Sequence, residues 1–568
     1  MKQLEKFLRN VGSTGLVLHD AASADAVTAR DPDWEVYPIG APLPDRQRWA
    51  GVALVVADRG ALRRVASTLP HLGRTRAIAC VFTDDDQPAH LAPRPDWPPV
   101  TRLSARALAS GGAMTVLQLQ EPMPAHAVFR ELARLAGTSL PGPSRIHLES
   151  PGHRRRFTLP PEIVVPFGRN VPVSDYDPDV APDPVIVTDP ELARGPLDEG
   201  VINPIGFHSE HDQGMATLEG TQSVSARTIA GLRTHQGVRV DWAEASPELA
   251  RTVAALAMAG IPLVGDPPPL EARPWLGEAL FGVLSGDADL TDPLRREEHS
   301  IRLRRAALLT HSGPGWRSRV AEAAGRTVPR FPTCSVVLAT RRPHQLDFAL
   351  KQVGRQRGID VELVVAAHGF EPDVGQVREQ LHGRAVEVVS LPPDTLFGDV
   401  LNAGVAASSG DVVVKMDDDD FYGPDFLLDL FLAREYSGAD VVGTPAEFVY
   451  LEDLNRTVRR TGTPRDASER FANLVAGGTI TIRRELLAAV GGFSPVRRFV
   501  DQQLFHATQA AGGTIYRSHG LGFMLQRTSD GHTWPVGDEH FLDSDRLRAQ
   551  WDGFVPTRIL EPDDLETA

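Results

Sequence analysis

The alternation of apolar runs with amphipathic segments over residues 334–416 is the feature that most constrains the fold. Four apolar runs are typical of buried strands: "CSVVLAT" (334–340), "VELVVAAHG" (361–369), "AVEVVSL" (385–391) and "DVVVKM" (411–416). Amphipathic helices are predicted between them at 344–356 and 397–410, the second ended by Gly410. Such a series predicts a parallel α/β sheet, whose ligand crevice lies at the carboxyl ends of the strands.

Four consecutive aspartates, Asp417 to Asp420, follow the fourth strand and are therefore expected at that crevice. An N-cap and helix-dipole role is possible, but it would use only one or two of the four carboxylates. Phe421 at the fifth position and no glycine at the sixth exclude a calcium EF-hand loop, and Phe421 also argues against a phosphatase-type site. The remaining interpretation is a divalent cation that bridges a diphosphate, since Asp417 and Asp419 can point toward one ligand.

Four ordered sequence blocks carry a resemblance to a known family. They are "CSVVLATRRP", "NAGVAASSGDVVVKMDDDDFYGPDFL", "GGTITIRRELLAAVGGF" and "VDQQLFHATQAAGG". Their order and spacing resemble those of family 2 glycosyltransferases with the GT-A fold, an α/β/α sandwich that binds nucleotide-diphospho-sugars. The resemblance implies that Asp417 contacts the ribose or sugar of the donor, that Asp419 binds Mn²⁺ or Mg²⁺ on the diphosphate, and that Asp420 orients the others.

The resemblance also implies roles for residues outside the acidic run. Thr340 and Arg342 match the first-strand loop that borders the nucleotide. The segment "YRSHGLGFMLQRTSDGHTW" (516–534) resembles the part of the family in which a His or Arg returns toward the diphosphate. His532 is therefore expected as a nitrogen ligand of the metal and Arg527 as a phosphate partner. A surface histidine is the alternative for His532, and His519 is a weaker rival for its role.

Two positions depart from the family pattern. Where the family places an aspartate that reads the base, this chain has Ala367, His368 and Gly369, so the identity of the base is left open. Where the family commonly has Glu-Asp before the acceptor-site helix, this chain has Val500 and Asp501. The resemblance implies that Asp501 is the catalytic base, because an inverting transfer needs a carboxylate to take the acceptor proton. The alternative is that Asp501 only caps the helix that it opens.

The predicted function is metal-dependent, inverting transfer of a sugar from a nucleotide-sugar donor to a hydroxyl of a polysaccharide, glycoconjugate or metabolite. A second hypothesis is a non-catalytic binding or assembly protein with a decayed GT-A domain, favoured by the missing base-reading aspartate and by Val500. A third is a sugar-1-phosphate nucleotidylyltransferase of similar fold. That class carries a glycine-rich loop after the first strand, and "ATRRP" has no glycine.

Composition limits the partners and the compartment. The net charge of −15 argues against nucleic acid as a partner, because phosphate backbones are bound through excess Lys and Arg. The two cysteines, Cys80 and Cys334, exclude a disulfide framework, and no apolar stretch is long enough to span a bilayer. The first residues, "MKQLEKFLRNVGSTG", contain no signal-peptide core, so a cytoplasmic location is expected. Richness in Ala, Arg, Gly and Pro is typical of a high-GC bacterial proteome.

The chain is long enough for several domains. We expect a Rossmann-like α/β domain at 1–140, a Pro-rich linker with a small β element at 141–185, a GT-B-like α/β module at 186–328, the GT-A domain at 329–545 and a C-terminal tail at 546–568. The regions before the GT-A domain are expected to bind the acceptor, a partner or a second copy of the chain.

Three other charged clusters have weaker interpretations. "VFTDDDQPAH" (81–90) reads as a solvated loop, because no helix follows to frame a metal site. His208, His211 and Asp212 have the spacing of metal ligands, but no helix holds the histidine pair and no further, distant ligand is identified. The basic segment 295–312 is expected to be a helix with a solvated face and Glu–Arg pairs one turn apart.

Overall fold

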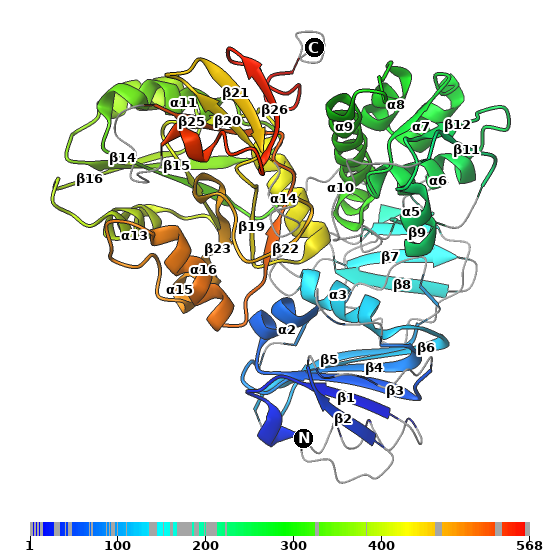
Figure 1. Cartoon of the computed structure of the whole chain (residues 1–568). Coiled ribbons are helices and arrows are strands. Elements are labelled where there is room, and N and C mark those ends of the chain that lie inside the picture. The colour runs from blue at the N-terminus through cyan, green and yellow to red at the C-terminus, as the bar shows by residue number, and fades with distance from the viewer. Residues whose placement is uncertain are drawn as a thin grey trace.

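Figure 1 shows a computed structural model of the chain. It describes residues 15–27, 34–39, 48–66, 72–86, 100–109, 111–135, 213–221, 224–323, 329–381, 383–460, 468–528 and 537–562, together with the strands within 145–186 and short pieces between these ranges. His208, His211, Asp212 and His532 lie outside the described residues, so the interpretations that involve them stay predictions. Among the described residues, no helix combines the length and the apolar character needed to cross a bilayer.

The N-terminal region is an α/β unit built on a six-stranded sheet. Its strand order is β2 (Trp34–Pro38), β1 (Gly15–His19), β3 (Gly51–Val56), β4 (Arg74–Phe82), β6 (Ala113–Pro124) and β5 (Val100–Ala107), and the first four strands are parallel. Alternate residues of these strands enter different hydrophobic clusters, and α2 (Arg59–Ala66) and α3 (Ala125–Leu135) pack on one face. The predicted α/β class is confirmed here.

A small sheet and a helical module follow. The small sheet has the order β10 (Val185–Ile186), β9 (Ile163–Pro166), β7 (Arg145–Ser150), β8 (His153–Thr158). The module has three parallel strands, β11 (Ala216–Leu218), β12 (Val238–Val240) and β13 (Leu263–Gly265), with α5 (Ala226–Leu232), α6 (Pro247–Met258), α7 (Arg273–Leu276), α8 (Glu278–Ser285), α9 (Pro293–His311) and α10 (Gly313–Ala323).

Helix α9 corrects one prediction. The sequence predicted a solvated basic face, but Arg296, Glu297, Glu298 and Arg304 of this helix are buried. Helix α9 lies beside α14 (Phe426–Ser437) of the C-terminal region, as Figure 1 shows. Glu297 and Arg304 form ion pairs with residues of the C-terminal region, whereas Arg296 donates to backbone carbonyls of its own module. One hydrophobic cluster also runs through both regions, so they share a core.

Carboxylates of the C-terminal region neutralise two arginines of α9, Arg304 and Arg305. Arg304 lies 2.5 Å from Glu469, and Arg305 lies 2.5 Å from Asp425 and 2.7 Å from Asp429. At Glu297 the helix supplies the carboxylate instead, and the buried Arg459 of the C-terminal region lies 2.5 Å from it. Buried ions require such pairing, since an unpaired charge in a protein interior is strongly destabilising.

The C-terminal region is built on an eight-stranded sheet. Its order is β16 (Val386–Leu391), β15 (Val361–His368), β14 (Cys334–Thr340), β17 (Val412–Met416), β23 (Thr481–Arg483), β19 (Val441–Gly443), β24 (Ile515–Arg517) and β22 (Arg470–Ala472). The first four strands are parallel, as the alternation predicted, and their carboxyl ends meet at one edge. Six helices belong to this region: α11 (Leu346–Gly354), α12 (Val374–Gln380), α13 (Phe397–Ala407), α14, α15 (Arg484–Ala489) and α16 (Val500–Ala510).

A second, five-stranded sheet completes the region. Its order is β18 (Phe421–Tyr422), β25 (Phe523–Arg527), β20 (Phe448–Leu451), β21 (Arg456–Arg460) and β26 (Leu547–Asp552). Strand β18 follows the acidic run directly and pairs with β25, which brings residues 417–420 beside the segment that contains Arg527. Strand β26 comes from the segment assigned to a tail, and Ile559 and Leu560 beyond it are buried.

Candidate active site

The four aspartates lie where the sequence placed them, directly after β17, but their surroundings differ. Asp418, the one aspartate of the run for which the resemblance implied no role, is buried and not exposed to solvent. The Thr340 hydroxyl donates to Asp418 Oδ2 at 2.5 Å, and the Arg342 guanidinium forms an ion pair with the same carboxylate. Since β14 and β17 are parallel neighbours, the loop after β14 meets the acidic run and fixes Asp418 there.

Arg342 also contacts the proposed metal ligand. Its guanidinium lies 2.8 Å from Asp419 Oδ2, so this arginine bridges Asp418 and Asp419. Burial raises the pKa of Asp419 to about 6 against the effect of Arg342, and the charges of Asp418 and Asp417 act in the same direction as burial. Burial and the neighbouring carboxylates also raise the pKa of Asp420 well above its usual value. The run therefore carries more negative charge than its contacts neutralise.

A lysine that sequence reasoning missed joins two of the proposed site residues. Lys415 lies on β17 and is 3% exposed. Its ammonium donates to Asp417 Oδ1 at 2.7 Å and to the Gly477 carbonyl at 2.9 Å, and it lies 3.5 Å from Asp501 Oδ1. Although burial lowers the pKa of Lys415, the carboxylates of Asp417 and Asp501 raise it above its usual value, so the side chain stays charged.

The structure brings Asp501 to the same place as the acidic run. Asp501 stands in the first turn of α16, and about a third of its side chain is exposed. Its Oδ1 atom is buried and accepts no hydrogen bond from the described residues. Burial and Asp417 raise the Asp501 pKa, and Lys415 opposes them. The residue before the helix, Phe499, has a φ of 63° and is 65% exposed, a strained conformation for a bulky side chain.

Two glycines make this approach possible. A Cβ atom on Gly477 would lie 2.2 Å from Asp501 Oδ2. A Cβ atom on Gly478 would lie 3.0 Å from Asp417 Oδ2 and 2.8 Å from the Tyr422 hydroxyl. That hydroxyl donates to the Gly478 carbonyl at 2.9 Å and accepts a hydrogen bond from the Asp417 amide, also at 2.9 Å. The glycine pair therefore lets the acidic run and α16 face one another without a side chain between them.

The segment around Arg527 lies beside the acidic run. The Gln526 amide donates to Asp420 Oδ1 at 3.0 Å. Arg527 is buried and its guanidinium stacks over Phe541 at 5.3 Å. Burial lowers the Arg527 pKa, and nearby carboxylates, Asp419 among them, oppose this. His519, the rival to His532, donates its Nε2–H to Asp429 Oδ2 at 3.1 Å and so belongs to the ion network of α9.

At the position where the resemblance places a base-reading aspartate, Ala367 and His368 are buried and Gly369 is exposed. Ala367 is fully buried and pairs in register with Thr340. The His368 ring bonds the Pro393 carbonyl at 3.1 Å, and burial lowers the pKa of this histidine. A neutral imidazole therefore stands where the family has a carboxylate.

The donor set fits a divalent cation that completes its coordination with a substrate. Within the described residues, no group of three His, Cys, Asp or Glu side chains has the arrangement of a preformed metal site. Mg²⁺ and Mn²⁺ in nucleotide sites typically take only one or two carboxylates and otherwise bind phosphate oxygens and water. The raised pKa values of Asp419 and Asp420 indicate excess negative charge that such a cation would relieve.

Lys415, Gly477, Gly478 and Tyr422 are the site residues that sequence reasoning missed. For Lys415 a signal was present, because a single lysine in the strand "VVVKM" cannot be buried without a carboxylate partner. The glycine pair lay in a block used for the resemblance, but nothing local indicated which side chains it would admit.

Comparison with known proteins agrees with this geometry. A family model described as Glycosyl transferase family 2 matches residues 335–505. The chain is 31% identical over 124 residues to Uncharacterized glycosyltransferase YwdF of Bacillus subtilis (strain 168), a match that covers 22% of this chain and 45% of the relative. It is 24% identical over 207 residues to Uncharacterized glycosyltransferase alr2836 of Nostoc sp. (strain PCC 7120), covering 32% of this chain and 64% of the relative.

Solved structures with a similar region include the mannosyltransferase PcManGT from Pyrobaculum calidifontis in complex with GDP-Man and Mn²⁺. The identity is 16%, the match covers 36% of this chain and 59% of that one, and the TM-score is 0.27. S. aureus TarS in complex with UDP-GlcNAc is also 16% identical, with 37% and 63% covered and a TM-score of 0.28. Likenesses at this level do not bear on the function of the present chain. The family match and the eight-stranded sheet of the structure together identify the C-terminal region of this chain as a family 2 glycosyltransferase domain with the GT-A fold.

Proposed function

We propose that this chain is a metal-dependent, inverting glycosyltransferase that moves a sugar from a nucleotide-sugar donor to an acceptor hydroxyl. The observation that carries the proposal is the meeting of Asp417 and Asp501 at one buried ammonium, that of Lys415. The two aspartates are far apart in the sequence, since Asp417 follows β17 and Asp501 stands in the first turn of α16. A donor-binding group and an acceptor-side base must lie this close if one sugar carbon is to lie between donor and acceptor.

Asp501 is the proposed general base. About a third of its side chain is exposed, and burial and the charge of Asp417 raise its pKa, which favours proton uptake. In the reaction, Asp501 takes the proton of the acceptor hydroxyl as that oxygen bonds to the anomeric carbon. The bond from the anomeric carbon to the diphosphate breaks on the opposite side. Lys415 keeps Asp501 ionised before the transfer, because its charge opposes the effect of burial.

Asp417 and Asp419 are proposed to hold the donor and its cation. Asp417 is about a third exposed, and its carboxylate accepts from Lys415; it is proposed to bind the ribose or the sugar. Asp419, with Asp417, would bind Mn²⁺ or Mg²⁺, which when bound neutralises charge on the departing diphosphate. Arg342, and Arg527 beside the run, are proposed to interact with the phosphates, and His532 stays a prediction as a further ligand.

A thermal-shift and donor-hydrolysis screen tests the proposal. The full-length chain is incubated with a panel of nucleoside diphosphates and nucleotide-sugars, with Mn²⁺ or with EDTA. We expect stabilisation by at least one nucleotide in the presence of metal, and its loss in Asp419→Ala together with a fall in donor hydrolysis of about 10²–10³-fold. Asp453→Ala, which removes an exposed carboxylate of the same domain, is the matched control and should respond like the unsubstituted chain.

Equal metal-dependent stabilisation and equal donor hydrolysis in Asp419→Ala and Asp453→Ala would show that Asp419 is not the metal ligand. Absence of any response to every donor would overturn the enzymatic proposal. It would favour the non-catalytic binding protein, for which the buried Ala367 and the ion pair between Arg342 and Asp419 would then be the structural basis.

A further inference from the structure

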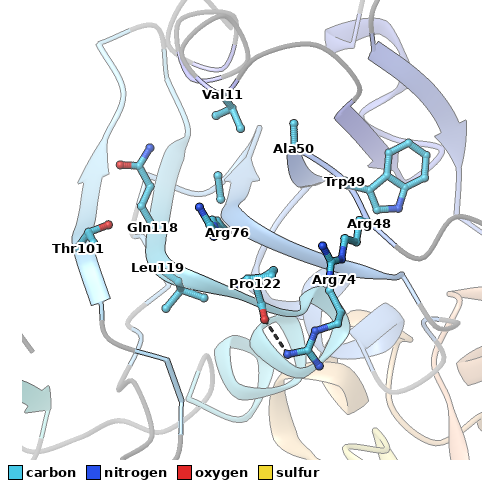
Figure 2. Close-up of a pocket in the computed structure, with 11 residues that line it drawn as sticks. Val11, Arg48, Trp49, Ala50, Arg74, Arg76, Thr101, Gln118, Leu119 and Pro122 are labelled. Carbon is cyan, nitrogen blue, oxygen red and sulfur yellow. Dashed lines mark hydrogen bonds between the residues drawn. The ribbon is translucent and has the colours of Figure 1, made fainter. Parts of the chain in front are cut away.

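A cavity of about 490 Å³ lies in the N-terminal region, away from the residues proposed for glycosyl transfer. Three arginines, Arg48, Arg74 and Arg76, line it together with Trp49 and Gln118. Figure 2 shows these side chains around one hollow, with Arg48 beside Arg74. Its size is that of a small-molecule site rather than of a packing defect.

A break in strand pairing creates this cavity. On β4, Thr75 pairs with Met123 and Ala77 pairs with Gln118, so four residues of β6 (119–122) lie opposite the single residue Arg76. Strand β5 is irregular at the same level, because Val100 pairs with Leu119 and Arg102 with Gln118, which leaves Thr101 unpaired. Two register shifts at one level open the sheet, and such bulges are frequent beside functional sites.

A buried threonine stabilises the opened sheet. Thr75 is fully buried, and its hydroxyl lies 3.1 Å from the Ala50 carbonyl and 3.2 Å from the Ala77 carbonyl. The Ala77 amide donates to the same hydroxyl at 3.2 Å. The side chain thus replaces backbone hydrogen bonds that the register shift removes, so the irregularity is held by specific contacts and is not a frayed end.

The arrangement of charge around the cavity indicates the ligand. Arg74 and Arg76 leave the same face of β4, since the buried Thr75 separates them in the strand. Arg74 is fixed at the rim by a 2.7 Å hydrogen bond to the Pro122 carbonyl, which still leaves guanidinium N–H groups for a ligand. Among the described residues that line the cavity there is no aspartate or glutamate, although the chain has a net charge of −15. Three arginines that line one cavity, with no carboxylate among its described lining residues, favour an anion.

We propose that this cavity binds a small phosphorylated ligand, at a site separate from the glycosyl-transfer site. The three guanidinium groups form paired hydrogen bonds to phosphate oxygens, and the flat Trp49 and apolar Leu119 contact the organic part. The proposal does not depend on the transferase function, because it rests only on residues of the N-terminal sheet.

Isothermal titration calorimetry of the full-length chain with pyrophosphate tests the proposal. EDTA is present throughout, and the titration is repeated on Asp419→Ala, so that binding at the acidic run is recognised. We expect binding that persists in Asp419→Ala and weakens about tenfold or more in Arg48→Gln and in Arg76→Gln, because each loses charge-assisted hydrogen bonds. Both arginines are exposed, so the substitutions should leave the thermal unfolding midpoint unchanged.

Arg106→Gln is the matched control. Arg106 is an exposed arginine on β5 that does not line the cavity, and its substitution should leave the affinity unchanged. Equal weakening in Arg106→Gln would mean non-specific attraction to a basic surface and would overturn the site. Loss of binding in Asp419→Ala alone, or no binding of pyrophosphate at millimolar concentration, would also overturn it. Tighter binding of citrate than of pyrophosphate would overturn the assignment to phosphate.

Discussion

The acidic crevice of the C-terminal sheet and the basic cavity of the N-terminal sheet handle charge in opposite ways. In the crevice, Lys415 and Arg342 are largely buried and pair with carboxylates at 2.7–3.5 Å and 2.8 Å. In the cavity, Arg48 and Arg76 are exposed, and none of the described lining residues carries a carboxylate. The crevice also forms at the carboxyl ends of parallel strands, whereas the cavity forms where antiparallel strands lose register.

This difference predicts how each region tolerates substitution. A buried ion that loses its partner leaves an uncompensated charge in a poorly solvated site, so stability and activity fall together. Replacement of an exposed cationic side chain by a neutral one changes the affinity for the ligand and leaves stability nearly unchanged. Substitutions in the C-terminal region, including its contact with α9, should therefore lower stability. Substitutions in the N-terminal cavity should lower only the affinity for its ligand.

The largest effect is expected for the proposed base. Asp501→Asn keeps the size and position of the side chain but cannot accept the acceptor proton, so transfer should fall about 10²–10⁴-fold. Donor binding should be retained, since Asp417 and Asp419 are unchanged. Transfer kinetics and donor thermal shifts on the same samples separate the two. A variant with full transfer activity would exclude Asp501 as the base.

The ion pair between α9 and the C-terminal region should give the largest effect on stability. Arg304→Met leaves the buried carboxylate of Glu469 without its cation, and the free energy of unfolding should fall by about 3–5 kcal/mol. Urea denaturation followed by circular dichroism measures this change. A change below about 1 kcal/mol would contradict the view that the two regions are joined through paired buried ions.

The pH dependence of stability should reveal the strain in the acidic run. The pKa of Asp419 is raised from 3.8 to about 6, so the folded chain holds this proton more tightly than the unfolded chain. The resulting stability is present below about pH 4 and is lost as the pH rises through about 6. In metal-free buffer, Asp419→Asn should therefore gain of the order of 1–3 kcal/mol over the unsubstituted chain between these limits. Unfolding midpoints of both proteins, measured across this pH range, test the prediction. Midpoints that change with pH in parallel in the two proteins would contradict it.

The smallest effect is expected for an ion pair of the N-terminal region. Arg59 lies 2.6 Å from Asp85, but the arginine is 44% exposed, so water screens the interaction. Arg59→Ala should change the free energy of unfolding by less than about 1 kcal/mol. The measurement used for Arg304→Met applies here too. An effect as large as that of Arg304→Met would show that burial does not account for the difference between the two regions.

Local pattern determined the parallel half of the eight-stranded C-terminal sheet in advance. The strands predicted at 334–340, 361–369, 385–391 and 411–416 are present as β14 to β17, with differences of at most a residue at their ends. Apolar runs and helical periodicity are properties of neighbouring residues, so they can be recognised without tertiary structure. The position of the four aspartates at the crevice follows from the same pattern, because it depends only on where a strand ends.

Tertiary structure alone decided which charged residues act together. The burial of Asp418 depends on the loop after β14, and the contact of Lys415 with Asp501 depends on α16, which is distant in the sequence. The burial of α9 and the opening of the sheet at Arg76 likewise depend on packing and strand register. A charged residue has the same identity in water or in a core, and only its distant neighbours determine whether it is solvated, paired or available to a ligand.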